Sequence, residues 1–451
     1  TFALVLLALY FALPLSAQVA PDLHWSTLTT PHFQVNFAPG LEPTARRLAG
    51  SAERAYTSLA LELHEPRGPI NITLGDNLDI SNGNATVFPT NRITIWARPN
   101  VDATSLKFLD DWIDLVITHE LTHIFHLDRS AGWWGVAQHI FGRNPFLFPN
   151  LYSPNWMSEG IAVYYESRLT GAGRIIGSEH AMVVRANALD GTTPALNAIS
   201  GATPVFPLGE MVYAYGSLLM DYITRTEGSE KMRAFVDKSA SNTIPFLLND
   251  NARASFGIGF TPAYQQWSDS IKRNAFAVAA RFTSPTDLTA RGWFTQRLRW
   301  LNDTTIIYGS NDGRSVSSLR ELRVGTNKKM EPRRIERRNS IDITVPLSNG
   351  GTLYAQQEYT DPYTVRNDLY SQQTGETRRL TTGARLMQPD ARFHGAANSC
   401  TTPQCTAPGW ENDLDIVAVQ LSPGSSGLVR VTFTTYGPVI APLTGFNRDT
   451  L

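Results

Sequence analysis

The first half of the chain alternates between short strand patterns and one long helical pattern. Residues 33–37, Phe-Gln-Val-Asn-Phe, alternate apolar and polar side chains, which predicts a half-buried strand. Over residues 41–63 apolar residues recur every three or four positions, as on one face of an amphipathic helix. Residues 70–74 and 92–96 predict further strands, with a Gly/Asn-rich turn near residues 82–84 between them.

These elements precede an apolar-periodic run over residues 105–128 that contains Thr-His-Glu-Leu-Thr-His. If this run is a helix, His119 and His123 project to one side, because residues four apart share a helix face. Two imidazoles on a rigid backbone can hold a zinc ion, and Glu120 beside them can take a proton from a metal-bound water. The alternative is an ordinary helix in which the spacing is accidental.

A second stretch, Asn-Trp-Met-Ser-Glu-Gly-Ile-Ala at residues 155–162, strengthens the metal interpretation. The pair H-E-L-T-H and W-M-S-E-G-I-A resembles the gluzincins, and specifically the bacterial peptidase MA-like group. The resemblance implies that one zinc ion is held by His119, His123 and Glu159, that Glu159 lies in the first turn of a later helix, and that Glu120 is the general base.

The resemblance also implies an α+β zincin-type metalloprotease domain over residues 18–282, with a mixed sheet, active-site helices and a helical C-terminal subdomain. In such folds an edge strand beside the cleft pairs with an extended peptide. Residues 92–97 are the candidate, and an ordinary internal strand is the alternative. The competing zincin pattern with a third histidine is not met, because His126 and Arg129 occupy its glycine and histidine positions.

Two further stretches flank the predicted site. Tyr213-Ala214-Tyr215-Gly216 is similar in spacing to the Tyr-Glu-Lys-Gly motif of aminopeptidase-N-like gluzincins, so Tyr213, or else Tyr215, is a candidate donor to the oxyanion. Both tyrosines are equally compatible with buried helix positions. The Gly-Ala-Met-Glu-Asn motif of that group is absent upstream of His119, which favours endopeptidase action.

The connection over residues 130–154 is rich in Trp, Phe, Tyr, Pro and Gly. Its aromatic residues can line a substrate pocket or touch a membrane, but we expect them to pack onto their own domain. His126 and His139 fall in or near this region, and we expect His126 to be a non-ligand histidine with satisfied hydrogen bonds.

After residue 282 the composition changes to Thr, Arg, Gly and short β-type runs. Two rounds of strands and turns repeat at a period of about 45 residues, within the range of propeller blades. Residues 283–451 therefore resemble a TolB-like β-propeller. About three blades fit, and since a propeller needs at least about four, we expect an incomplete all-β propeller in a chain truncated at both ends.

Residues 3–17 form an apolar stretch that ends in Leu-Ser-Ala, which predicts a signal peptide over residues 1–17, with an uncleaved anchor as the alternative. Cys400 and Cys405 are close enough for a small disulfide loop, which agrees with export to the periplasm, the cell envelope or the medium. The net charge of −1 gives no reason to expect nucleic acid as a partner.

The sequence thus predicts an exported zinc metallopeptidase that acts on peptide or protein substrates, with no transmembrane helix beyond the signal segment. Two alternatives remain. One is a zinc-bound scaffold that has lost catalysis, against which the presence of Glu120 argues. The other is a protein whose main task is to bind a partner through the propeller.

Overall fold

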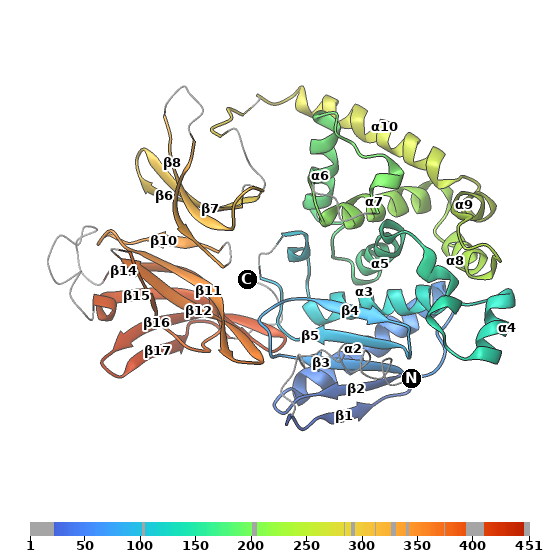
Figure 1. Cartoon of the computed structure of the whole chain (residues 1–451), viewed down its shortest axis with the longest axis horizontal. Coiled ribbons are helices and arrows are strands. Elements are labelled where there is room, and N and C mark those ends of the chain that lie inside the picture. The colour runs from blue at the N-terminus through green and yellow to red at the C-terminus, as the bar shows by residue number, and fades with distance from the viewer. Residues whose placement is uncertain are drawn as a thin grey trace, which may run out of the picture.

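The computed structural model describes residues 22–101, 104–200, 205–283, 285–289, 294–311, 313–325, 331–339, 342–373, 375–393 and 410–445. The signal segment of residues 1–17 and both cysteines lie outside these ranges. Figure 1 shows a helical and mixed-sheet region joined to a region of β-sheets. None of the helices in the described ranges is both long and apolar enough to cross a membrane.

The N-terminal region is built on a mixed sheet of five strands in the order β1-β2-β3-β5-β4. The strands are β1 (Ser26–Thr29), β2 (Phe33–Phe37), β3 (Ile70–Gly75), β4 (Gly83–Thr86) and β5 (Arg92–Trp96). β2, β3 and β5 are parallel, whereas β1 and β4 pair antiparallel at the two edges. The alternation that predicted β2 is real, because Phe33, Val35 and Phe37 are buried.

One part of this prediction was wrong. Residues 92–97 were the candidate edge strand, but β5 has β3 on one side and β4 on the other. The edge strand is β4, in the Gly/Asn-rich segment that the sequence predicted to be a turn. Pairing with β5, which sets Gly83 opposite Ile95, makes this segment extended despite its low strand propensity.

Helices cover the sheet and form the rest of this region (Figure 1). They are α2 (Glu42–Glu62), η1 (Thr104–Lys107), α3 (Trp112–Leu127), α4 (Gly132–Phe141), η2 (Pro145–Leu147), η3 (Pro149–Tyr152), α5 (Asn155–Thr170), α6 (Ser178–Leu189), η4 (Leu196–Ala198), α7 (Glu210–Glu227), α8 (Lys231–Ser241), α9 (Leu248–Phe256) and α10 (Phe260–Ala279).

Helix α3 lies in the interior, and nearly every residue from Trp112 to His126 is buried. Its start is fixed by Asp111, whose side chain accepts hydrogen bonds from the backbone N–H groups of Ile113 and Asp114 at 2.8 and 3.2 Å. A rigid, buried helix of this kind holds its side chains in fixed directions, which a metal site requires.

Helices α5 and α7 pack against each other with almost no space between their backbones. A Cβ atom added at Gly216 would lie 2.0 Å from the carbonyl oxygen of Trp156, and one added at Gly160 would lie 2.6 Å from the carbonyl carbon of Gly216. This close approach brings the side chains at the start of α7 next to those of α5.

The C-terminal region contains three antiparallel sheets of four strands each, in which sequential strands are neighbours. The first has β6 (Phe294–Asn302), β7 (Thr305–Asn311), β8 (Ser318–Arg323) and β9 (Arg333–Arg337); the second has β10 (Thr344–Pro346), β11 (Thr352–Asp361), β12 (Thr364–Gln373) and β13 (Glu376–Arg379); the third has β14 (Leu386–Phe393), β15 (Leu414–Ser422), β16 (Ser425–Thr434) and β17 (Gly437–Pro442). The described strands form no closed barrel, and the propeller stays a prediction.

The β-sheets are attached to the N-terminal region through the loop between β3 and β4. Asp79 in this loop is fully buried, accepts a hydrogen bond from the backbone N–H of Asn367 at 2.9 Å and pairs with Arg385 at 2.8 Å. Asp76 pairs with the same guanidinium at 2.7 Å. Backbone bonding continues the attachment, since Leu78 forms a parallel bridge with Val365. The loop that leads into the edge strand β4 is therefore held by the β-sheet region.

Candidate metal centre

Three side chains converge where α3 faces α5. His119 and His123 lie one turn apart on α3, and their Nε2 atoms are 3.2 Å apart. Oε2 of Glu159, from α5, lies 3.4 Å from each of these nitrogens. Glu159 is one turn into α5, which begins at Asn155, and not in the first turn as expected. The structure thus brings together the three side chains that the resemblance implied as ligands.

The spacing of these donors fits a single metal ion. Ligand atoms about 2.0–2.1 Å from a tetrahedral zinc are about 3.3 Å from one another, close to the 3.2 and 3.4 Å separations seen here. Oε2 of Glu159 is buried and has no hydrogen-bond donor among the described residues. A buried oxygen without a donor beside two imidazoles is chemically suited to a cation. His119, His123 and Glu159 also form the one metal-compatible cluster found within the described ranges.

Electrostatics agree with this geometry. Without a metal ion, burial opposes the charge on His119, but the neighbouring carboxylates of Glu159 and Glu166 raise the pKa of His119 to about 9. Burial also opposes the charge on Glu159, and the two histidines outweigh it and hold the pKa of Glu159 well below its usual range. The glutamate is therefore ionised at neutral pH and offers a charged oxygen to a cation.

Glu120 lies beside the ligands and faces the same cavity, which has a volume of about 520 Å³. Its side chain is buried, and burial raises the pKa of its carboxyl above the ordinary value. The carboxylate fits because residue 83 of the edge strand is a glycine. A Cβ atom there would lie 2.7 Å from Oε1 of Glu120.

Tyr213 lines this cavity from the first turn of α7. Burial raises the pKa of Tyr213 to about 12, so the hydroxyl keeps its proton at neutral pH. Tyr215 is fully buried and its hydroxyl accepts a hydrogen bond from Asn187 at 2.9 Å, away from the cavity. Of the two candidates, only Tyr213 faces the site.

A buried ion pair supports His119 from behind, and sequence reasoning missed it. Glu166 is fully buried, with Oε2 3.0 Å from Nδ1 of His119 and 2.5 Å from Nη2 of Arg174. Nη2 of Arg174 also lies 2.9 Å from Nδ1 of His119, so the ion pair engages Nδ1 and leaves Nε2 to bind a metal. The guanidinium of Arg174 also lies over the ring of Tyr213, 4.9 Å from its centroid, and so joins both sides of the site.

One feature of the sequence could have identified Glu166 as part of the site. It follows Glu159 by seven residues, which places both on the same face of α5. Arg174 lies beyond the helix, and nothing in its sequence context indicates its role. Glu210, at the start of α7, also lines the cavity and accepts a hydrogen bond from Ser105 at 2.9 Å.

His126 is buried and is not a member of the metal cluster, as expected, but neither of its ring nitrogens has a hydrogen-bond partner among the described residues. The expectation that it is satisfied was wrong. Burial lowers the pKa of His126 to about 3, so the ring is neutral.

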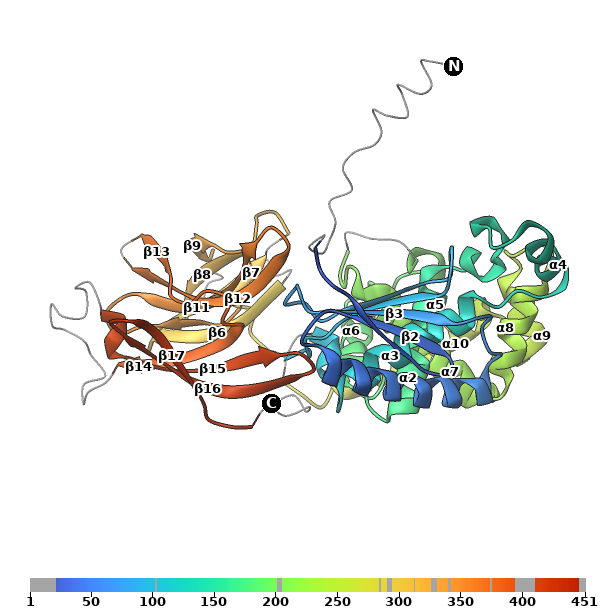
Figure 2. The same ribbon diagram turned by 90° about the horizontal axis from the view of Figure 1, so that it is seen from below.

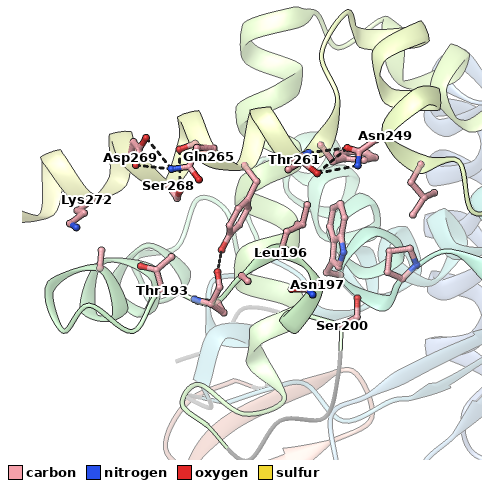
Figure 3. A pocket seen from close by; sticks show the side chains of 18 of the residues that line it. Thr193, Leu196, Asn197, Ser200, Asn249, Thr261, Gln265, Ser268, Asp269 and Lys272 are labelled. Atoms are coloured by element: carbon pink, nitrogen blue, oxygen red, sulfur yellow. Dashed lines mark hydrogen bonds between the residues drawn. The ribbon is translucent and has the colours of Figure 1, made fainter.

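A larger cavity of about 900 Å³ lies on the other side of Pro154, between α10 and the segment around η4. Figure 3 shows Gln265, Ser268, Asp269 and Lys272 along α10, facing Thr193 and Leu196. Its lining contains no histidine or glutamate. The chemistry therefore favours the smaller cavity, where titratable groups with shifted pKa values gather.

No family model matches the chain, and no curated protein matches it. Among solved structures it is similar to an M1 zinc metallopeptidase from Deinococcus radiodurans, at 16% identity over 55% of this chain and 52% of that one, with a TM-score of 0.28. A two-domain M1 zinc metallopeptidase bound to L-tryptophan gives 14% identity over 55% and 51% of the two chains, also with a TM-score of 0.28.

Aminopeptidase A of Legionella pneumophila, in complex with aspartic acid, gives 12% identity over 80% of this chain and 37% of that one, with a TM-score of 0.29. The chain spans about half the length of the M1 zinc metallopeptidases it matches. Similarity this weak carries no argument about this chain.

Proposed function

We propose that the protein is a zinc-dependent peptidase. The observation that carries the proposal is the set of three donor atoms 3.2–3.4 Å apart, in a cavity that also contains Glu120 and Tyr213. Zinc bound by His119, His123 and Glu159 would supply a Lewis acid and lower the pKa of a bound water to about 7.

The residues of the chain supply the rest of the chemistry. Glu120 is placed to accept a proton from the attacking water and to deliver it to the leaving amine. Its raised pKa favours this role, because a base works best when its pKa approaches the working pH. A scaffold that had lost catalysis would have no use for a buried, unligated carboxylate at this position.

Tyr213 is placed to donate its hydroxyl proton in a hydrogen bond to the oxyanion that forms at the scissile carbonyl. Two features prepare it for this task. Its pKa of about 12 keeps the phenol protonated, and Arg174 lies over its ring and restricts the movement of the side chain.

The edge strand β4 is the proposed binding site for the substrate backbone. Gly83, Asn84 and Ala85 line the cavity, and among the described strands only β5 pairs with β4. An extended peptide can add to the other edge of β4 and pass the ligands. We therefore propose endopeptidase action, and we propose export from the apolar segment of residues 3–17.

The test is to measure zinc content and cleavage of casein and of an N-terminally blocked peptide with the full chain. We expect one zinc per chain, loss of zinc in Glu159→Ala, and retention of zinc without cleavage in Glu120→Gln. Cleavage of the blocked peptide separates endopeptidase from aminopeptidase action. Zinc without cleavage in the wild type would leave the scaffold or partner-binding alternative.

A further inference from the structure

Helix α4 and the segments beside it expose large apolar side chains to solvent. Six of these side chains make up a surface that we call the apolar tip, and each is 44–74% exposed. They are Trp133, Val136, Ile140, Phe141, Phe146 and Phe246. The opposite face of α4 is packed, since Trp134, Ala137 and Gln138 are buried. The prediction that the aromatic connection packs onto its own domain is therefore correct for one face of α4 and wrong for the other.

The members of the apolar tip come from two parts of the chain that contact each other. Nε1 of Trp134 donates a hydrogen bond to the carbonyl of Asn242 at 2.7 Å, which ties α4 to the segment that follows α8. The rings of Tyr152 and Phe246 meet edge to face, with their centroids 5.8 Å apart. Soluble proteins rarely leave a continuous apolar surface of this kind uncovered.

The two chain segments that carry the tip are almost free of charged residues. Residues 130–153 and 240–249 contain Arg143 and no other Asp, Glu, Lys or Arg, whereas the chain average of 18% predicts about six. Arg143 is turned inward, with Nη1 2.8 Å from Asp128 and Nη2 2.8 Å from the side-chain oxygen of Asn91. A solvated surface would not lose its charges in this way.

We propose that the apolar tip docks on a lipid bilayer and inserts the exposed face of α4 into the boundary between headgroups and acyl chains. Helices that lie in this boundary bury an apolar face that includes Trp or Phe, and their backbone needs no partner. Because the tip lacks basic side chains, insertion depends on apolar burial, and zwitterionic lipids suffice as the partner.

Three observations favour a bilayer over a protein partner. In both views α4 lies at the end of the molecule opposite the β-sheet region and projects from it (Figures 1 and 2). The cavities at the metal ligands, along α10, between α2 and α3 and between α5 and α7 have no member of the tip in their linings. Protein interfaces also need about one hydrogen bond per 100–200 Å², and the exposed polar side chains here are few, chiefly His139, Asn144 and Thr243.

The chain segment that carries Phe146 of the tip also reaches the metal cavity. Leu151 on η3 is exposed, follows Phe146 by five residues and lines that cavity. Docking of the tip would therefore bring the segment that contributes Leu151 to the cavity close to the bilayer. The inference does not depend on catalysis, and a protein without peptidase activity would dock equally well.

The experiment measures co-sedimentation of the full chain with vesicles of phosphatidylcholine, at low and at high salt. We expect binding that changes less than twofold between 50 and 500 mM salt, roughly the range over which screening abolishes surface electrostatics. The test variant is Phe141→Asp with Phe146→Asp, for which we expect at least tenfold weaker binding. The matched control is Phe276→Asp with Phe282→Asp, which alters exposed phenylalanines far from the tip.

Two further measurements keep the test independent of folding. One is the binding of a milder variant, Val136→Ser with Ile140→Ser. The other is the quenching of tryptophan fluorescence in the wild type by brominated lipid. Equal binding by wild type and tip variants would overturn the proposal. Absence of vesicle binding together with a dimer that the tip substitutions dissociate would overturn it in favour of a second copy as the partner. Binding only to anionic vesicles would also overturn it, because the attraction would then be electrostatic.

Discussion

Glu166→Gln tests whether the buried ion pair behind His119 supports the metal site. The substitution keeps the shape of the side chain and its ability to accept a hydrogen bond from Nδ1 of His119, but removes the negative charge. Arg174, of which 6% is exposed, is then left with a buried positive charge and no carboxylate partner. We expect two separate consequences, one for stability and one for metal binding.

The expected loss of stability is about 3–5 kcal/mol, the usual cost of breaking a buried ion pair by removing one partner. Domains are typically stable by about 5–15 kcal/mol, so the variant should still fold. The expected loss of zinc affinity is about 10–100-fold, as for other groups that orient a ligating histidine. Urea unfolding of the metal-free protein measures the first effect, and competition with a chromophoric chelator measures the second.

A second variant separates the two effects. Glu166→Gln combined with Arg174→Met removes the unpaired charge, so stability should recover while zinc affinity stays low. The control is Glu62→Gln, which breaks an ion pair with Arg168 at the surface and should cost less than about 1 kcal/mol. If Glu166→Gln changed unfolding by less than about 1 kcal/mol and zinc affinity by less than twofold, the assigned role of the pair would be wrong.

Three further predictions address the other parts of the site. Tyr213→Phe should lower kcat by about 10²–10³-fold with zinc content unchanged, because the oxyanion loses a donor. Gly83→Ala should lower activity by about 10²-fold and retain zinc, since the added Cβ would displace the carboxylate of Glu120. His126→Leu should lose less stability than the wild type as the pH falls below 6.5. Urea unfolding at pH 7 and pH 5 measures the difference.

The sign of the last effect follows from the pKa of His126, which burial lowers from 6.5 to about 3. As pH falls below 6.5 the unfolded chain takes up a proton that the folded chain cannot, so stability falls by about 1.4 kcal/mol per pH unit. The variant should lack this contribution. An equally steep decline in wild type and variant would show that the ring is protonated in the fold or that the acid sensitivity arises elsewhere.

Controls exist for the two kinetic predictions. Tyr215→Phe removes a hydroxyl that contacts Asn187 and should leave kcat unchanged. Gly209→Ala places a Cβ where no atom lies within 4 Å and should leave activity unchanged. A fall in kcat with Tyr215→Phe as large as with Tyr213→Phe would mean that packing of α7, and not a donor at Tyr213, limits the reaction.

The sequence predicted the elements in which apolar residues recur with the period of a strand or of a helix. β2, β3, β5 and α2 were found in this way, and the four-residue spacing of His119 and His123 identified the face of α3. β4 was missed because its Gly and Asn residues resemble a turn, and only pairing with β5 makes the segment extended. The Glu166–Arg174 pair was missed because the two residues meet only after α5 turns into the following loop.

The aromatic connection shows a different limit. Its composition indicates apolar contacts, but the sequence does not say whether those contacts lie within the fold or outside it. Trp133 and Trp134 are neighbours, yet the first is 44% exposed and the second is buried against the segment after α8. Helical geometry separates adjacent residues by about 100°, so only the placement of α4 decides which side is covered.

The attachment of the β-sheet region gives it a physical connection to the metal cavity. Arg385 pairs with both Asp76 and Asp79, and Val365 bonds to the backbone of the same loop, so the loop is held at several points. The strand that follows, β4, carries the glycine that contacts Glu120. A shift of the β-sheets would move β4, and with it the space available to the general base. The β-sheet region therefore has a structural role at the site, because its contacts with the loop before β4 hold the edge strand that flanks the metal ligands.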